Sequence, residues 1–227
     1  MNLRKLHNLF YPKRGEVWML HRVVEQRSSL PQQRVLEVTP SWLGQQIELR
    51  RAQGVRFVSI DEALRPQTRN FVCLTLDDGY ADYLHTALPL FQRMQVPFAA
   101  YITTGFLDGV SPVPWYAGQQ VGLTSEGLRR LAGDPLCTIG AHTVSHPHLA
   151  DLYADAQELE IEQSRQRLEG LTGKPVRHFS YPHGSYNAAT VAICRRLGFR
   201  SAVTTSGRTV RTDAAPLELD RINIVQP

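Results

Sequence analysis

The sequence predicts one α/β domain in which strands and helices alternate around a parallel sheet. Short apolar runs alternate with segments of helical spacing over most of the 227 residues, which is the pattern of successive βα units. No linker or internal repeat divides the chain, and a barrel of this length forms one domain. Several aspartate and histidine residues, which could act as catalytic groups or metal ligands, also follow directly after apolar runs. In a βα barrel those positions converge on one face, where active sites are built.

The expected strands are apolar runs rich in β-branched and aromatic residues. In chain order they cover residues 17–20, 56–60, 71–76, 96–103, the run that ends at 141, 179–181, 201–205 and 219–225. The expected helices cover residues 42–51 (with Ser41 as the candidate cap), 83–94, a short one around 128, 154–171 and 187–197. Residues 105–122, rich in Pro and Gly, are expected to form a long functional loop that contains Trp115 and Tyr116. Within the expected domain 1–227, residues 1–16 are predicted to be a flexible extension.

Composition and charge exclude several classes of function. The net charge of +4 and the pI near 9.1 come from scattered arginines, so nucleic-acid binding is not expected, while an anionic saccharide is compatible. No apolar stretch has the length of a membrane span, and the first residues lack the apolar core of a signal peptide, which together predict a cytoplasmic protein. The three cysteines are widely spaced without a CxxC pair, so no disulfide framework is predicted.

Two polar motifs follow the strongest apolar runs. The first contains Asp77 and Asp78 before a glycine, and the second contains His142 and His146. Either motif alone is a weak signal, because Asp-Asp-Gly favours turns and histidines four apart are common on surfaces. Together, one carboxylate and two imidazoles suit Zn²⁺ or another divalent transition ion and leave coordination positions open. This assigns Asp78, His142 and His146 to a metal, and leaves Asp77 to take a proton from water.

The two motifs, Thr75-Leu76-Asp77-Asp78-Gly79 and His142-Thr143-Val144-Ser145-His146, resemble the first two motifs of the polysaccharide deacetylases, the NodB-homology group or carbohydrate esterase family four. The resemblance covers residues 17–225. It implies a distorted (β/α) barrel with its active site at the C-terminal ends of the strands. It also implies metal-dependent removal of N- or O-acetyl groups from sugars, with Asp77 as general base. The metal is expected to be Zn²⁺, with Co²⁺, Ni²⁺ or Mn²⁺ as alternatives.

The run Phe179-Ser180-Tyr181-Pro182-His183-Gly184 is similar to the third motif of bacterial exopolysaccharide deacetylases. Ser180 stands where most of the family has an arginine that steadies the base. The resemblance implies that the backbone N–H of His183 stabilises an oxyanion. Tyr181 and Pro182 are expected in the wall of the pocket.

The N-terminal run Val17-Trp18-Met19-Leu20-His21 resembles the last motif of the family, in the permuted order of poly-N-acetylglucosamine deacetylases. This resemblance implies that His21 is the general acid. Asp220 and Arg221 stand where the fourth motif would fall. Arg221 is expected to replace the missing arginine and keep Asp77 ionised, and Asp220 is expected to tune His21. Asp82 is interpreted as a cap of the helix that follows it.

The function predicted from the sequence is deacetylation of an amino-sugar-containing poly- or oligosaccharide. The expected substrate is a bacterial exopolysaccharide or its precursor, which would associate the protein with envelope-polysaccharide synthesis. Trp115 and Tyr116 favour a sugar, because pyranose faces pack on aromatic rings. Two alternatives remain open: a related metal-dependent amidase that acts on a non-sugar C–N bond, and a catalytically inactive saccharide-binding module.

Overall fold

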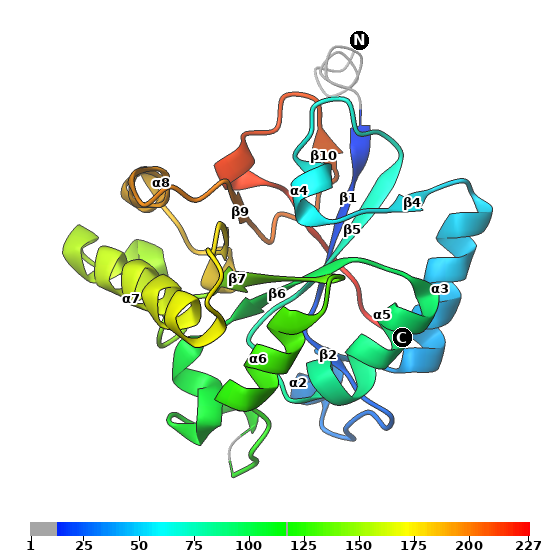
Figure 1. Ribbon diagram of the computed structural model, residues 1–227, viewed down its shortest axis with the longest axis horizontal. Helices are drawn as coiled ribbons and strands as arrows, with labels where there is room; N and C mark the ends of the chain where they lie inside the picture. Colours follow the sequence, from blue (N-terminus) through cyan, green and yellow to red (C-terminus); the bar gives the residue numbers. More distant parts are fainter. Residues whose placement is uncertain (1–12, 117) are drawn as a thin grey trace.

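The computed structural model describes residues 13–116 and 118–227, and its centre is a curled sheet (Figure 1). Within the described residues this sheet has nine strands, and its main path runs β10-β1-β5-β6-β7-β8-β9, with β11 beside β1 and β4 beside β5. The bounds are β1 (Lys13–Leu20), β4 (Arg56–Phe57), β5 (Phe71–Leu76), β6 (Phe98–Ile102), β7 (Cys137–Ala141), β8 (His178–Ser180), β9 (Ser201–Val203), β10 (Val210–Arg211) and β11 (Ile222–Asn223). A separate parallel pair joins β2 (Arg22–Val23) to β3 (Glu37–Val38).

The strands from β1 through β5, β6, β7 and β8 to β9 pair in parallel, as consecutive βα units require. The segment 219–223 joins the two ends of this series. Leu219 forms a parallel bridge with Val203 of β9, and Ile222 pairs with Trp18 of β1. The sheet therefore closes through one short irregular strand, and the predicted single-domain distorted α/β barrel is confirmed.

Helices pack around the outside of the sheet, with α3, α5, α6, α7 and α8 forming the outer layer (Figure 1). Their bounds, with the shorter elements, are α2 (Pro31–Arg34), α3 (Pro40–Ala52), α4 (Ile60–Ala63), the π-helix η1 (Tyr83–Ala87), α5 (Leu88–Met94), α6 (Ser125–Gly133), α7 (Ala154–Thr172), α8 (Ala188–Arg196), and the 3-10 turns η2 (Thr104–Gly109), η3 (Pro114–Tyr116), η4 (Leu149–Asp151), η5 (Pro182–Gly184) and η6 (Pro216–Glu218). Among the described helices, none has the length and hydropathy needed to cross a membrane.

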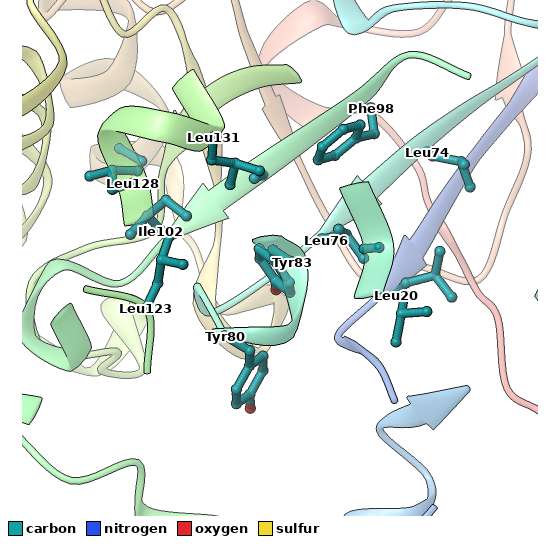
Figure 2. Close-up of a cluster of buried hydrophobic side chains, with 14 of the residues drawn as sticks. Leu20, Leu74, Leu76, Tyr80, Tyr83, Phe98, Ile102, Leu123, Leu128 and Leu131 are labelled. Carbon is teal, nitrogen blue, oxygen red and sulfur yellow. The ribbon is translucent and has the colours of Figure 1, made fainter. Parts of the chain in front are cut away.

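Apolar residues at strand and helix spacing fill the space between the sheet and this outer layer. Figure 2 shows part of the main cluster, to which β1, β5, β6 and α6 contribute leucine, isoleucine and phenylalanine side chains. Every residue of β5 is buried, which is typical of a central parallel strand covered on both faces. The buried strands hold their carboxyl ends at one edge, so the residues that follow β1, β5, β7 and β8 are brought together.

Three local predictions are wrong. Residues 13–16 form the first half of β1, because Lys13 and Gly15 pair with β10; residues 1–12 lie outside the described part of the chain. Thr39, not Ser41, caps α3, since Pro40 takes the first helical position and the Thr39 side chain accepts from the Trp42 N–H. Asp82 does not cap the following helix through its side chain. Its carboxylate contacts the segment after β1 instead.

Candidate active site

The predicted site residues from β1, β5 and β7 line one cavity of about 220 Å³ at the C-terminal ends of the strands. Its lining consists of Met19, His21, Leu36, Asp77, Asp78, Trp115, His142, His146, His183 and Thr205. A larger, open groove of about 980 Å³ lies between α3 and α5, where the charged lining residues are Glu48, Arg51 and Arg93. The groove lacks the convergent histidines and carboxylates of the smaller cavity, so the smaller cavity is the candidate active site.

Asp78, His142 and His146 form a compact set of potential metal ligands whose donor atoms lie within 4.8 Å of one another. Oδ1 of Asp78 is 3.5 Å from Nε2 of His142 and 3.3 Å from Nε2 of His146. Oδ1 is buried and has no hydrogen-bond partner within the described residues. Since a buried acceptor without a partner is costly, this oxygen between two imidazole nitrogens fits a divalent cation.

The hydrogen bond at the far side of His142 supports the same interpretation. Its Nδ1 lies 2.7 Å from the carbonyl oxygen of Ser180, which can only accept, so Nδ1 carries the proton. In the neutral ring Nε2 is then the unprotonated nitrogen, and it lies 3.5 Å from Oδ1 of Asp78. A backbone carbonyl that fixes the tautomer in this way is the usual outer support of a metal-ligating histidine.

The segment from His142 to His146 is a tight turn and not a helical turn. Thr143 and His146 have φ of +66° and +63°, and Asp78 has φ of +82°. Residues other than glycine rarely adopt these backbone conformations. The turn is held by Glu160 of α7, whose carboxylate accepts hydrogen bonds from the Val144 N–H at 2.8 Å and the Ser145 N–H at 2.9 Å. Such strain persists only where surrounding contacts impose it, and it concentrates at functional sites.

Asp77 is held by a buried arginine. Nη1 of Arg221 donates to Oδ1 at 2.7 Å and Nη2 donates to Oδ2 at 2.6 Å, while the Ser180 hydroxyl donates to Oδ2 at 3.1 Å. Burial on its own would raise the pKa of Asp77, but the charge and the hydrogen bonds of Arg221 bring that pKa below its ordinary value. Asp77 is therefore a carboxylate in the folded protein, and both Ser180 and Arg221 donate hydrogen bonds to it.

All five N–H donors of Arg221 have acceptors. Besides Asp77, the guanidinium donates to the Thr204 carbonyl at 2.8 Å, the Thr75 hydroxyl at 3.1 Å and the Ser180 hydroxyl at 2.9 Å. The side chain is completely buried, with 0% of its surface exposed. The geometry thus gives Arg221 a single orientation, aimed at Asp77.

His21 directly follows β1 and lines the cavity together with Asp77 and Asp78. Burial lowers the pKa of His21, and the two aspartates act in the opposite direction. Asp220, expected beside His21, instead accepts a hydrogen bond from Ser206 and lies 3.5 Å from Nε of Arg208. Its expected effect on His21 stays a prediction.

Of the three residues expected from the third motif, His183 lines the cavity. Tyr181 and Pro182 are buried, and the Tyr181 hydroxyl donates to the Leu217 carbonyl at 2.8 Å. Successive side chains of a strand point to opposite faces, so Ser180 contacts Asp77 while Tyr181 turns into the core. His183 has φ of +58°, and its ring lies against His146 with centroids 4.4 Å apart.

The sequence did not identify Tyr80, Glu160 and Thr205 as parts of the site. Tyr80 donates a hydrogen bond to Asp78, and Thr205 lines the cavity. In the sequence Tyr80, two residues after Asp78, is indistinguishable from an ordinary aromatic core residue. Glu160 is one of several charged residues in α7. Only their spatial position distinguishes these three residues, because none of them belongs to one of the recognisable motifs.

Comparison with known proteins indicates one family. The model of the polysaccharide deacetylase family matches residues 65–202 of this chain. A putative polysaccharide deacetylase YxkH of Bacillus subtilis (strain 168) is 27% identical over 153 residues, which are 67% of this chain and 51% of that protein. A chitooligosaccharide deacetylase of Azorhizobium caulinodans is 33% identical over 63 residues, 27% of this chain and 30% of that protein. The chain thus spans about half, or less, of the length of these curated relatives.

Two solved structures share the fold along nearly the whole chain. The Streptococcus pyogenes deacetylase PplD, in complex with acetate, has a TM-score of 0.78 at 24% identity and covers 94% of this chain and 93% of its own. IcaB from Ammonifex degensii has a TM-score of 0.79 at 22% identity, with 94% and 92% covered. At 24% and 22% identity, the similarity to these two structures shows that the chain shares their fold.

Proposed function

Because the chain belongs to the polysaccharide deacetylase family, we propose that it is a metal-dependent hydrolase that removes acetyl groups from an amino-sugar-containing poly- or oligosaccharide. The observation that carries the proposal is the pairing of Asp77 with the buried Arg221, beside three potential metal ligands. A carboxylate that is ionised at neutral pH and lies next to a site for a cation is what a base needs to activate water.

Asp78, His142 and His146 would hold the ion, and Zn²⁺ fits one carboxylate and two imidazoles, with Co²⁺, Ni²⁺ or Mn²⁺ as alternatives. When bound, such an ion polarises the acetyl carbonyl and lowers the pKa of a water molecule toward ~7. The three ligand atoms leave room for substrate, which is the arrangement of a catalytic and not a structural site.

Asp77 is proposed to take the proton from the attacking water. Its Oδ2 already accepts hydrogen bonds from Arg221 and Ser180, whereas Oδ1 accepts one from Arg221. Since a carboxylate oxygen has two lone pairs, Oδ1 keeps one accepting position. Arg221 therefore orients the base without occupying it fully.

His21 is proposed to donate a proton to the departing nitrogen, from the wall contributed by β1. The backbone N–H of His183 is proposed to stabilise the oxyanion that forms when water attacks the acetyl carbon. Its neighbour Gly184 has φ of +67°, and a Cβ there would lie 2.1 Å from Oγ1 of Thr205. This turn can therefore approach the cavity only with glycine in that position.

The proposed substrate is N-acetylated glucosamine within a bacterial exopolysaccharide or its precursor. Trp115 lines the cavity, and an aromatic wall is suited to the apolar face of a pyranose ring. The Azorhizobium relative is named a chitooligosaccharide deacetylase, which agrees with this class of sugar.

Acetate release from N-acetylglucosamine oligomers tests the proposal. With Zn²⁺ or Co²⁺ the purified chain should release acetate, and Asp77→Asn should reduce the rate at least ~100-fold. His142→Ala should abolish both stoichiometric metal binding and turnover. His85→Ala, which removes an exposed imidazole from η1, is the matched control and should change neither.

Two results would contradict the proposal. Normal acetate release by Asp77→Asn or by His142→Ala would show that the cavity is not the catalytic site. Stoichiometric Zn²⁺ without acetate release from any acetylated sugar would favour the amidase or the saccharide-binding alternative.

A further inference from the structure

Two hydrogen bonds lead from the wall of the cavity to a proposed metal ligand. Nε1 of Trp115 donates to the hydroxyl oxygen of Tyr80 at 2.6 Å, and Tyr80 is 2.9 Å from Oδ2 of Asp78. An indole N–H can only donate, and Tyr80 has one hydroxyl proton. The direction of the chain is therefore fixed: Trp115 donates to Tyr80, and Tyr80 donates to Asp78.

The two carboxylate oxygens of Asp78 consequently differ. Oδ2 accepts the Tyr80 hydrogen bond, while Oδ1 is buried without a hydrogen-bond partner in the described parts of the chain. Oδ1 is also the oxygen that lies near His142 and His146, at 3.5 and 3.3 Å from their Nε2 atoms. Tyr80 thus leaves one defined oxygen of Asp78 directed at the two imidazoles.

The backbone around Tyr80 is held in register by the loop that carries Trp115. The Leu123 N–H donates to the Gly79 carbonyl at 2.9 Å, and the Ala81 N–H donates to the Val121 carbonyl at 2.8 Å. The Trp115 ring also packs 5.1 Å from the His146 ring. Trp115 therefore contacts one proposed ligand directly and reaches another through Tyr80.

Packing alone does not account for the Tyr80 hydroxyl. The ring lies edge-on to Tyr83 and Tyr116, with centroids 6.1 and 5.7 Å away, and these contacts would persist in phenylalanine. Figure 2 shows Tyr80 at the margin of the core cluster, with its hydroxyl directed away from the leucine side chains. The hydroxyl is placed by its two polar partners.

We propose that Tyr80 is a positioning residue that reserves Oδ1 of Asp78 for the metal ion, and that Trp115 orients the Tyr80 hydroxyl for this task. The inference rests on the metal dependence in the proposed function. It extends that function because Trp115, which a bound sugar would contact in the cavity wall, would also affect the affinity of the protein for the metal ion.

The affinity of the purified protein for Zn²⁺, measured by competition with a chelator and without any sugar, tests this inference. Tyr80→Phe should raise the Kd ~10- to 100-fold, the usual effect of removing an outer hydrogen bond to a ligand. Trp115→Phe, which keeps a ring but loses the N–H, should raise the Kd a few-fold. The double variant should bind as Tyr80→Phe does, because Trp115 acts through the Tyr80 hydroxyl.

Tyr101→Phe is the matched control, since its equally buried hydroxyl has no hydrogen-bond partner in the described structure, and its Kd should be unchanged. Visible absorption of the Co²⁺-loaded protein adds a signature that loss of packing would not produce. In Tyr80→Phe both oxygens of Asp78 become available to the ion, so the higher coordination number should weaken the absorption bands.

An unchanged Kd and an unchanged Co²⁺ spectrum in a folded Tyr80→Phe would overturn the inference and leave the proposed function intact. If Tyr80→Phe does not fold, Trp115→Phe decides in the same way, because its side chain is only partly buried. Failure of the wild-type chain to bind Zn²⁺ would instead defeat the proposed function.

Discussion

At the scale of single residues, the barrel depends on the buried ion pair between Arg221 and Asp77. A guanidinium with all five donors satisfied and a carboxylate that it contacts twice are stable only together. Removing either partner leaves the other charged and desolvated. The pair therefore links the stability of the fold to the charge of the proposed base.

We predict that Arg221→Ala lowers the free energy of unfolding by ~3–5 kcal/mol, because it leaves the Asp77 carboxylate buried without its cation. The Arg221→Ala/Asp77→Asn double variant should lose less than the sum of the single variants. Urea denaturation of the four proteins measures this coupling. Arg208→Ala, at a position whose side chain is 72% exposed, should change stability by less than ~0.5 kcal/mol. Additive losses would show that Arg221 and Asp77 are not directly coupled.

His178 provides a prediction about pH. The buried ring contacts the Ser201 hydroxyl at 2.8 Å, and burial lowers its pKa from the ordinary 6.5 to about 4, although Asp61 opposes the shift. Between these values the unfolded chain binds a proton that the folded chain does not, so stability falls as the pH drops. The loss between pH 7.5 and pH 5 is about 2 kcal/mol from this group.

His178→Gln removes this titration. Its free energy of unfolding should depend less on pH than that of the wild type, by about 2 kcal/mol between pH 7.5 and pH 5. Urea titrations of both proteins at the two pH values measure the difference. The same pH dependence in both proteins would show that His178 does not remain neutral in the folded state.

At the scale of elements, Asp82 connects the segment after β1 to the turn that carries the proposed base. Its Oδ1 accepts from the Val23 N–H at 3.0 Å and its Oδ2 from Nε of Arg22 at 2.7 Å. On the other side of His21, the Leu20 carbonyl accepts from the Asp77 N–H at 3.0 Å. The backbone is thus fixed immediately before and after His21.

This arrangement predicts that Asp82→Ala impairs the proposed general acid more than the rest of the site. Hydrolysis of an N-acetyl sugar should slow ~10-fold more than hydrolysis of 4-nitrophenyl acetate, because an amine must be protonated to leave and 4-nitrophenolate need not be. Comparison of kcat/KM for the two substrates measures the effect. Asp155→Asn, at an exposed position in the first turn of α7, should change neither rate. Equal losses on both substrates would indicate a general structural defect.

The elements that could be predicted from the sequence are those with a strong local signal. The apolar runs located β5, β7 and β8, and Gly173 marked the end of α7, where it adopts φ of +66°. The π-helix before Pro89 could not be predicted from the sequence, because the spacing of its apolar residues is also compatible with an ordinary α-helix. The wrong interpretation of Asp82 has the same cause: its partners, Arg22 and Val23, lie about 60 residues earlier.

The candidate site shows the same limit. Asp78, His142 and His146 belong to motifs of adjacent residues, so the sequence could name them, and the structure brings them together. The support of Asp77 by Ser180 depends on the register between strands 103 positions apart. Register is set by packing of the whole sheet, and no local pattern encodes it.

At the scale of the whole molecule, the proposed metal would connect β5 to the turn after β7. An ion that binds only the folded chain stabilises it by ~2.7 kcal/mol at a concentration 100-fold above Kd. For a chain of this length, Zn²⁺ should then raise the thermal midpoint by roughly 5–10 °C. Thermal unfolding with and without a chelator measures this shift. It should disappear in His142→Ala, and a shift of equal size in that variant would place the ion elsewhere.

The short segment 219–223, which joins β9 to β1, also affects the order in which the site can form. His21 and Arg221 are 200 positions apart, yet one lines the cavity and the other holds the base. During synthesis the first strand leaves the ribosome long before the arginine exists. Until then the sheet is not closed, and Asp77 lacks the cation that keeps it ionised when it is buried. A nascent chain should therefore gain activity abruptly, once residue 221 has emerged and paired, and not gradually as the earlier strands fold.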